Sequence, residues 1–211
     1  MTFVLSLTGS IGMGKSATAS LFRRLGVPVH DADAVVHDLY RGEAAEPIEA
    51  AFPGTVAGGV VDRAKLGAAV LGDPDRLEVL EGIVHPLVRA KREAFLRDAL
   101  RRGAPLVVLD IPLLFETGGD RECDAVLVVT APEAVQRERV LARPGMTEAK
   151  LDAIRAKQAP DAQKRAQAHF LVDTSRGFAS AEAQVRSILA CLAGRPGRIL
   201  RNPGRWRTDA A

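Results

Sequence analysis

Residues 9–16 constrain the fold of this chain more than any other segment. They read Gly-Ser-Ile-Gly-Met-Gly-Lys-Ser, a complete G-x-x-x-x-G-K-[ST] pattern. Backbone amides in such a loop surround phosphate oxygens, its lysine reaches the β- and γ-phosphates, and its final hydroxyl contacts Mg²⁺. A short apolar run, Phe3–Leu7, precedes the loop, and Ser16–Leu25 carries apolar residues at helical spacing. Strand, loop and helix in this order predict a nucleotide-binding loop rather than a glycine-rich turn without a ligand.

Every residue of this loop, and the one after it, is a candidate nucleotide ligand. The N-terminus of the following helix adds a partial positive charge that faces the anion. The chain has a single asparagine, Asn202, and so lacks the N-K-x-D element with which GTP-binding switches read guanine. This disfavours a conventional GTPase. The expected nucleotide-binding residues are Gly9, Ser10, Ile11, Gly12, Met13, Gly14, Lys15, Ser16 and Ala17.

Apolar segments separated by helical patterns predict a mainly parallel five-stranded sheet with helices on both faces, a three-layer α/β/α fold. Hydrophobic residues make up 47% of the chain but aromatic ones only 4%, so the core should consist mainly of Ala, Leu and Val. The predicted strands are Phe3–Leu7, Val27–His30, Leu106–Leu109, Ala125–Thr130 and Phe170–Val172.

A long helical insertion is expected between the second and third of these strands. Residues 34–103 contain no convincing strand. They contain a helix at Arg63–Leu71, opened by an Asp62 cap, and a second at Asp75–Leu100, which Pro86 should kink or divide.

A second insertion, residues 136–167, is highly charged and helical, with Thr147 as an N-cap. Polar helices beside a nucleotide site are typical of a mobile lid. The Arg-, Pro- and Gly-rich tail should be disordered. The expected division is a core of residues 1–30, 104–135 and 168–194, a helical acceptor-binding insertion of 31–103, a lid of 136–167 and a tail of 195–211.

Composition excludes several function classes. The formal net charge is only +3, with much of the arginine excess after Gly194, which is too localised for a chain that binds nucleic acid throughout. Cys123 and Cys191 lack CxxC spacing and form no zinc pattern with the four histidines. No apolar run approaches the length of a membrane span, and the N-terminus lacks the basic region of a signal peptide. We therefore expect a cytoplasmic protein without a membrane partner.

A carboxylate follows the strand Leu106–Leu109. Asp110 is similar to the strand-end aspartate of phosphate-loop proteins that holds Mg²⁺ directly or through water. Alone it could be a polar turn residue, but the loop at 9–16 favours the metal role. Ile111 stands where many ATPase motors have a water-activating Glu, which favours phosphate transfer to a substrate, although Glu116 is near enough to leave hydrolysis open.

Asp31 and Asp33 follow the second predicted strand, at the sheet edge where strand ends face the ligand crevice. A carboxylate there can accept a proton from an attacking hydroxyl. It can equally cap the next helix. The residues alone leave both roles open, with one aspartate capping and the other catalysing as a further option.

The lid supplies cations. Arg139 and Arg143 are four residues apart, would share one helix face, and are the leading candidates to contact the transferring phosphoryl group. An arginine there can contribute about 10³–10⁵ in rate. The alternative for most such charges is simple solvation. His85 precedes Pro86 and by itself indicates a buried histidine at a helix kink.

Together these motifs resemble the dephospho-coenzyme A kinase family. The resemblance runs from residue 3 to about residue 193. It rests on LTGSIGMGKS at 7–16, DAD at 31–33, HP at 85–86, DIPLLFE at 110–116, R-x-x-x-R at 139–143, R-x-x-Q-A at 155–159 and Lys164.

The resemblance implies that ATP and 3′-dephospho-CoA give ADP and CoA, the last step of coenzyme A synthesis, by attack of the ribose 3′-hydroxyl on the γ-phosphate. It implies that Lys15 and the loop amides hold ATP, that Ser16 binds Mg²⁺, and that Asp33 is the general base with Asp31 beside it. The implied acceptor site is Asp31, Asp33, His85, Leu114, Phe115 and Glu116, and the implied lid cations are Arg139 and Arg143.

The chain departs from the family pattern in three places. Ala168-His169-Phe170 stands where the family often has Ala-Asp-aromatic at the start of the last strand. Asp173-Thr174 stands where the family often has Asp-Asn, which removes an amide that could border adenine. Pro144-Gly145 replaces an acidic pair after the lid arginine and should alter lid motion.

Two other functions remain open from the sequence. One is a nucleoside or nucleotide kinase of the same fold. The other is a non-catalytic ATP-binding regulator whose tail binds RNA through its arginines and Trp206, with a solvated tail as the alternative. We expect a monomer or a weak homo-oligomer.

Overall fold

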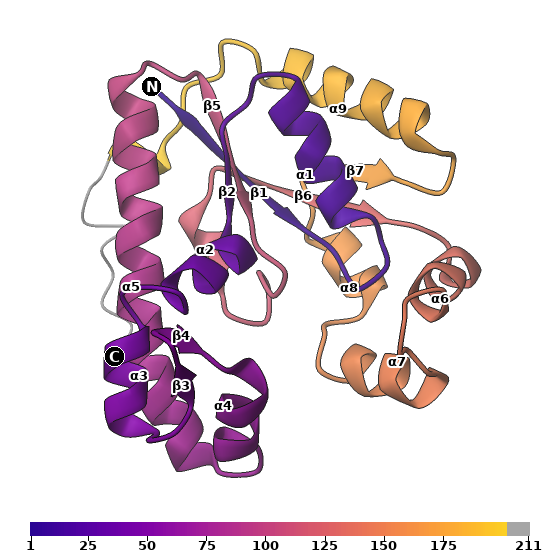
Figure 1. Ribbon diagram of the computed structural model, residues 1–211. Coiled ribbons are helices and arrows are strands. Elements are labelled where there is room, and N and C mark those ends of the chain that lie inside the picture. Colours follow the sequence, from indigo (N-terminus) through magenta and orange to yellow (C-terminus); the bar gives the residue numbers. More distant parts are fainter. Residues whose placement is uncertain (202–211) are drawn as a thin grey trace. The chain divides into compact units, whose positions relative to one another are not determined.

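The computed structural model describes residues 1–201, whose contacts divide into two units (Figure 1). Unit 1 comprises Met1–His30 and the chain from Ala99 onward, and unit 2 comprises Asp31–Asp98. Unit 1 contains β1 (Phe3–Thr8), α1 (Lys15–Arg24), β5 (Leu106–Asp110), η1 (Gly119–Glu122), β6 (Ala125–Thr130), α6 (Glu133–Leu141), α7 (Glu148–Arg155), α8 (Asp161–Ala166), β7 (Phe170–Asp173), α9 (Phe178–Leu192) and η2 (Ile199–Arg201). Unit 2 contains α2 (Ala32–Leu39), α3 (Ala45–Ala51), β3 (Val56–Ala57), β4 (Val60–Val61) and α4 (Arg63–Val70). Two elements have residues in both units: β2 (Val29–Asp31) and α5 (Pro74–Arg101).

The sheet of unit 1 has the strand order β2-β5-β1-β6-β7, with β1 at its centre. β1 pairs in parallel with β5 and β6, and β6 pairs in parallel with β7. All of β1 is buried, as expected for a strand covered on both faces. The prediction of a mainly parallel five-stranded α/β fold is confirmed.

Helices α1 and α9 contact each other and cover one face of this sheet (Figure 1). Leu5 and Leu7 of β1 point to this layer, where they meet Phe22 of α1 and Val185 of α9. Burial of such side chains contributes about 1.5–3 kcal/mol each. The layer therefore fixes α1, and with it the loop that leads into α1.

Unit 2 has its own apolar core, formed by Leu39, Ile48, Phe52, Leu66 and Leu80 among others. The Asp62 cap is confirmed, because its carboxylate accepts the N–H groups of residues 64 and 65. The expectation that this stretch has no strand is wrong: β3 and β4 form a short antiparallel hairpin. Its turn is Gly58-Gly59, both at positive φ, which glycine adopts at no steric cost.

Helix α5 runs unbroken through Pro86, so the predicted division of this helix is wrong. Proline removes one helical hydrogen bond. Val84 before it and Leu87 after it both pack in the core of unit 2, and these contacts hold the helix on both sides of the proline.

The start of the tail is ordered, contrary to the expected disorder. The N–H groups of Arg198 and Ile199 donate to Oδ1 of Asp124 at 2.6 and 3.0 Å, and Oδ2 of Asp124 accepts the N–H of Val4 at 2.9 Å. The remainder of the predicted disordered tail, residues 202–211, lies outside the described residues, as does the proposed stacking residue Trp206.

Candidate active site

The phosphate loop joins the buried end of β1 to the N-terminus of α1. Gly12 shows why the loop needs glycine, because its φ is +77° and an added Cβ would lie 2.6 Å from Cγ2 of Val140. Gly14 has a φ of +89° and lies against Thr174, whose Oγ1 would be 3.0 Å from such a Cβ. Helix α6 and the end of β7 therefore pack directly on the loop backbone.

Lys15 and Asp110 meet at the carboxyl edge of the sheet. Nζ of Lys15 lies 2.8 Å from Oδ1 of Asp110, and the two side chains are only 14% and 2% exposed. The pair forms because Leu7 and Asp110 are in register on the adjacent strands β1 and β5. Asp110 thus holds the lysine that reaches the β- and γ-phosphates in such loops.

Mg²⁺ sites in phosphate-transfer proteins combine one or two carboxylates with substrate phosphates and water. Ser16 is exposed in the first turn of α1, and Asp110 ends the strand beside the loop. A hydroxyl and a carboxylate are oxygen donors of the kind Mg²⁺ prefers, so these residues fit the ion. Among residues 1–201 there is no group of three or more His, Cys, Asp or Glu side chains that could hold a metal without a substrate.

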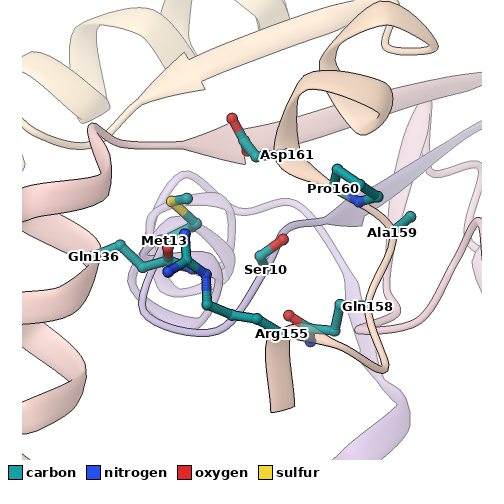
Figure 2. Close-up of a pocket in the computed structure, with 8 residues that line it drawn as sticks. All are labelled: Ser10, Met13, Gln136, Arg155, Gln158, Ala159, Pro160 and Asp161. Carbon is teal, nitrogen blue, oxygen red and sulfur yellow. The ribbon is translucent and has the colours of Figure 1, made fainter. Parts of the chain in front are cut away.

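A cavity of about 260 Å³ lies beside the phosphate loop (Figure 2). Arg155 at the end of α7 contributes a guanidinium to it and also binds Oε1 of Glu133 at 2.7 Å. The residues around it come from the loop, from α6, from the end of α7, from the start of α8 and from the segment between these two helices. They are Ser10, Met13, Gln136, Arg155, Gln158, Ala159, Pro160 and Asp161.

Arg139 lies on the β7 side of the loop. Its guanidinium donates to Oγ1 and to the carbonyl oxygen of Thr174, both at 2.8 Å. The same Thr174 hydroxyl donates to the carbonyl oxygen of Met13 at 2.9 Å. Thr174 therefore ties Arg139 to the phosphate loop.

Arg143 does not share a helix face with Arg139. Helix α6 ends at Leu141, and Arg143 is exposed beyond it, so the expectation of one shared helix is wrong. Pro144 explains the end of the helix, because the residue before a proline is disfavoured in the α conformation. The role of either arginine in catalysis stays a prediction.

Glu116 follows β5 and is held by the segment after α7. Its Oε1 lies 2.9 Å from Nζ of Lys164, a side chain with no exposed surface, and accepts the N–H of Ala159 at 2.8 Å. Burial raises the pKa of Glu116, but the Lys164 ammonium and the Ala159 N–H outweigh it, so the pKa is lowered. Nearby, Leu114 is fully buried and Phe115 partly so.

The remaining predicted site residues belong to unit 2. Asp31 caps α2, since its Oδ1 accepts the N–H of Ala34 at 3.1 Å. Asp33 is exposed in the first turn of α2, which leaves its carboxylate open to solvent. His85 is exposed on α5, so the interpretation of a buried histidine is wrong. Asp31 therefore has the helix-capping role that the sequence left open between Asp31 and Asp33.

Sequence reasoning missed several side chains that touch the loop. Gln136 and Gln158 bind the backbone of Ile11, and Thr174 binds that of Met13. The R-x-x-Q-A motif marked Gln158 without assigning it a role. Nothing in the local sequence marked Gln136, which is 3% exposed and reads as an ordinary helix residue.

A parallel sheet, a phosphate loop leading into a helix, and an acid on the adjacent strand that holds the loop lysine define a P-loop nucleotide-binding protein. Ile111, and not a glutamate, follows Asp110. A family model described as dephospho-CoA kinase matches residues 3–180, and the chain belongs to this family.

Individual relatives agree with this assignment. A dephospho-CoA kinase of Mesorhizobium japonicum is 61% identical over 194 residues, which cover 92% of this chain and 98% of the relative. One from Rhodopseudomonas palustris is 58% identical over 195 residues, with the same coverage. A solved structure of a Thermus thermophilus protein is 36% identical with a TM-score of 0.79, covering 92% of this chain and 99% of its own. A dephospho-CoA kinase from Campylobacter jejuni shares the fold at 22% identity and a TM-score of 0.63, covering 90% and 97%.

Proposed function

We propose that this protein transfers the γ-phosphate of ATP to the ribose 3′-hydroxyl of 3′-dephospho-CoA and releases ADP and CoA. Membership of the dephospho-CoA kinase family supports the acceptor. The observation that carries the chemistry is the Lys15–Asp110 pair at the end of the phosphate loop. It supports the assignment of Lys15 as the cation that reaches the β- and γ-phosphates in such loops.

Mg²⁺ would be held by Ser16 and Asp110 together with the phosphates, and it would neutralise charge that develops on the transferring group. Lys15 and the loop amides bind the phosphates and orient them. Arg139 and Arg143 are the proposed lid cations, within a lid of residues 136–167. The expected cytoplasmic location and the oligomeric state stay predictions.

Asp33 is the proposed general base, which would accept the proton of the 3′-hydroxyl as that oxygen attacks. Its exposure and the use of Asp31 as the helix cap support this division of roles. We propose that residues 31–103 bind the acceptor, with His85 on this insertion, and that Leu114, Phe115 and Glu116 are further acceptor-binding residues.

A coupled assay of ADP release tests the reaction. Dephospho-CoA should give product, whereas nucleosides and nucleoside monophosphates should not. Equal turnover of a nucleoside or a monophosphate would favour the nucleotide-kinase alternative instead.

Asp33→Asn tests the base. ATP binding should persist while turnover falls by about 10²–10⁴-fold, the usual contribution of a general base. Asp38→Asn is the matched control, because Asp38 is also exposed on α2. Normal turnover in Asp33→Asn would show that Asp33 is not the general base, but it would not contradict dephospho-CoA as the acceptor.

A further inference from the structure

The peptide groups around Ile11, the third residue of the phosphate loop, are bound on both sides by glutamine side chains. Oε1 of Gln158 accepts the Ile11 N–H at 3.1 Å, and Nε2 of Gln136 donates to the Ile11 carbonyl at 2.8 Å. In Figure 2 the two glutamines reach the loop from different elements. A loop amide of the kind that receives phosphate oxygens is thus occupied by a side-chain carbonyl.

The backbone that carries Gln158 is fixed on its far side. The N–H of Ala159, the next residue, donates to Oε1 of Glu116 at 2.8 Å. The same oxygen pairs with the fully buried Lys164 at 2.9 Å. Gln158 itself is partly buried. Its side chain is therefore directed at the loop from an anchored segment and is not a loose surface group.

The position of Ile11 in the loop determines which phosphate could replace Oε1 of Gln158 as the acceptor of the Ile11 N–H. The later part of the loop leads to the N-terminus of α1, whose amides surround the phosphates nearer the nucleoside. Ile11 lies four residues before Lys15, in the first half of the loop. Because Lys15, four residues later, reaches the β- and γ-phosphates in such loops, we take a phosphate oxygen that reaches the Ile11 amide to belong to the terminal group. It would bind more strongly than a neutral carbonyl, because its hydrogen bond is charge-assisted.

We propose that Gln158 is a positioning residue for the γ-phosphate. Its Oε1 holds the Ile11 amide before ATP arrives and yields that amide to a γ-phosphate oxygen when ATP binds. ADP has no γ-phosphate and leaves the Gln158–Ile11 bond in place. The exchange lets the segment between α7 and α8 respond to ATP and not to ADP. This inference rests on the proposed use of ATP but not on the identity of the acceptor.

Affinities for ATP and ADP, measured by calorimetry on the full chain, test the exchange. Gln158→Ala removes the competitor for the Ile11 amide, so the ratio of the ATP Kd to the ADP Kd should fall by about fivefold, the worth of one ordinary hydrogen bond. Gln158→Glu supplies a stronger acceptor that also repels phosphate, so the ratio should rise. Opposite signs in the two variants are not expected from a merely structural role.

Gln163→Ala and Gln163→Glu are matched controls, because Gln163 is exposed on α8, and they should leave the ratio unchanged. A ratio that is the same in both Gln158 variants as in the wild type would overturn the proposal.

The wild-type protein gives an independent test if a variant fails to fold. The side-chain amide resonance of Gln158 should shift with a non-hydrolysable ATP analogue and not with ADP, and equal behaviour with both nucleotides would also overturn it. If the wild-type protein did not phosphorylate dephospho-CoA but the Kd ratios changed as expected, that result would count against the proposed acceptor and not against the role of Gln158.

Discussion

At the scale of single residues, the Lys15–Asp110 pair makes the clearest prediction. Asp110 is 2% exposed and Lys15 14% exposed, so neither charge is well solvated. Asp110→Asn leaves the lysine charge uncompensated, and removing one partner of a buried pair costs about 3–5 kcal/mol. Phosphate groups would restore a partner. Without Mg²⁺, ATP should therefore raise the Tm of Asp110→Asn more than that of the wild type.

Thermal unfolding with and without ATP, in a chelator, measures this difference. Asp152→Asn serves as the control because Asp152 is exposed on α7. An ATP-induced shift in Asp110→Asn no larger than in the wild type would show that Asp110 does not compete with phosphate for Lys15.

The sequence predicted the residues of the phosphate loop but not the side chains that bind its backbone. A loop motif is local, so eight consecutive residues are enough to recognise it. The contacts of Ile11 with Gln136 and Gln158, and of Met13 with Thr174, join residues more than a hundred positions apart. Such contacts depend on how α6, the α7–α8 segment and β7 pack, which residue spacing does not encode.

At the scale of elements, Glu116 and Lys164 join the loop after β5 to α8. Lys164→Met removes the cation from a fully buried position and leaves Glu116 without its ion partner. The variant should lose unfolding free energy, but less than the about 3–5 kcal/mol of a fully buried pair, because Glu116 is 17% exposed and keeps the Ala159 N–H. The double variant Glu116→Gln with Lys164→Met should be more stable than Lys164→Met alone, because no charge then remains unpaired.

Denaturant unfolding of the wild type, both single variants and the double variant completes a double-mutant cycle. Arg165→Met is the control for the loss of a cation from α8, since Arg165 is exposed. Additive effects of the two substitutions would contradict an ion pair that stabilises the fold.

The same pair predicts a dependence on pH. The pKa of Glu116 is lowered from its ordinary value of 4.5 because Lys164 and the Ala159 N–H outweigh the effect of burial. A carboxyl with a lower pKa in the folded state stabilises above its unfolded pKa, and this stability is lost as the pH falls through the folded pKa. The stability difference between the wild type and Glu116→Gln should therefore be largest near neutral pH and shrink on acidification below 4.5. If this stability difference stayed constant on acidification, the charge of Glu116 would not be the source of the stabilisation of the fold.

The largely buried strands of the sheet centre were the elements that the sequence predicted well. Ala125–Thr130 matches β6 residue for residue, and the strand before the loop differs only by Thr8. The hairpin of β3 and β4 was missed because two-residue strands carry no alternation, although Gly58-Gly59 is a turn signal. Pro86 does not divide α5, since packing in unit 2 outweighs its local cost.

At the scale of the whole molecule, Asp124 joins the beginning of the chain to the described part of its tail. One carboxylate accepts the N–H groups of Val4, Arg198 and Ile199. Asp124 is 7% exposed, and Val4 is fully buried, so the N–H of Val4 has no access to water if the carboxylate is removed. The arginine-rich composition of the tail suggested disorder, because composition does not reveal a distant acceptor.

Truncation after Gly194 should destabilise the protein, because it removes two of the three donors to Asp124 and leaves Oδ1 without the two N–H groups it accepts. An unsatisfied buried polar group costs about 1–3 kcal/mol, which for a chain of this size lowers Tm by about 2–4 °C per kcal/mol. Truncation after Arg201 keeps both donors and should give a higher Tm than truncation after Gly194. Asp124→Ala should destabilise more than the longer truncation, since it also leaves the N–H of Val4 without its acceptor. Equal Tm values for the two truncations would show that the contacts of residues 198 and 199 add nothing to stability.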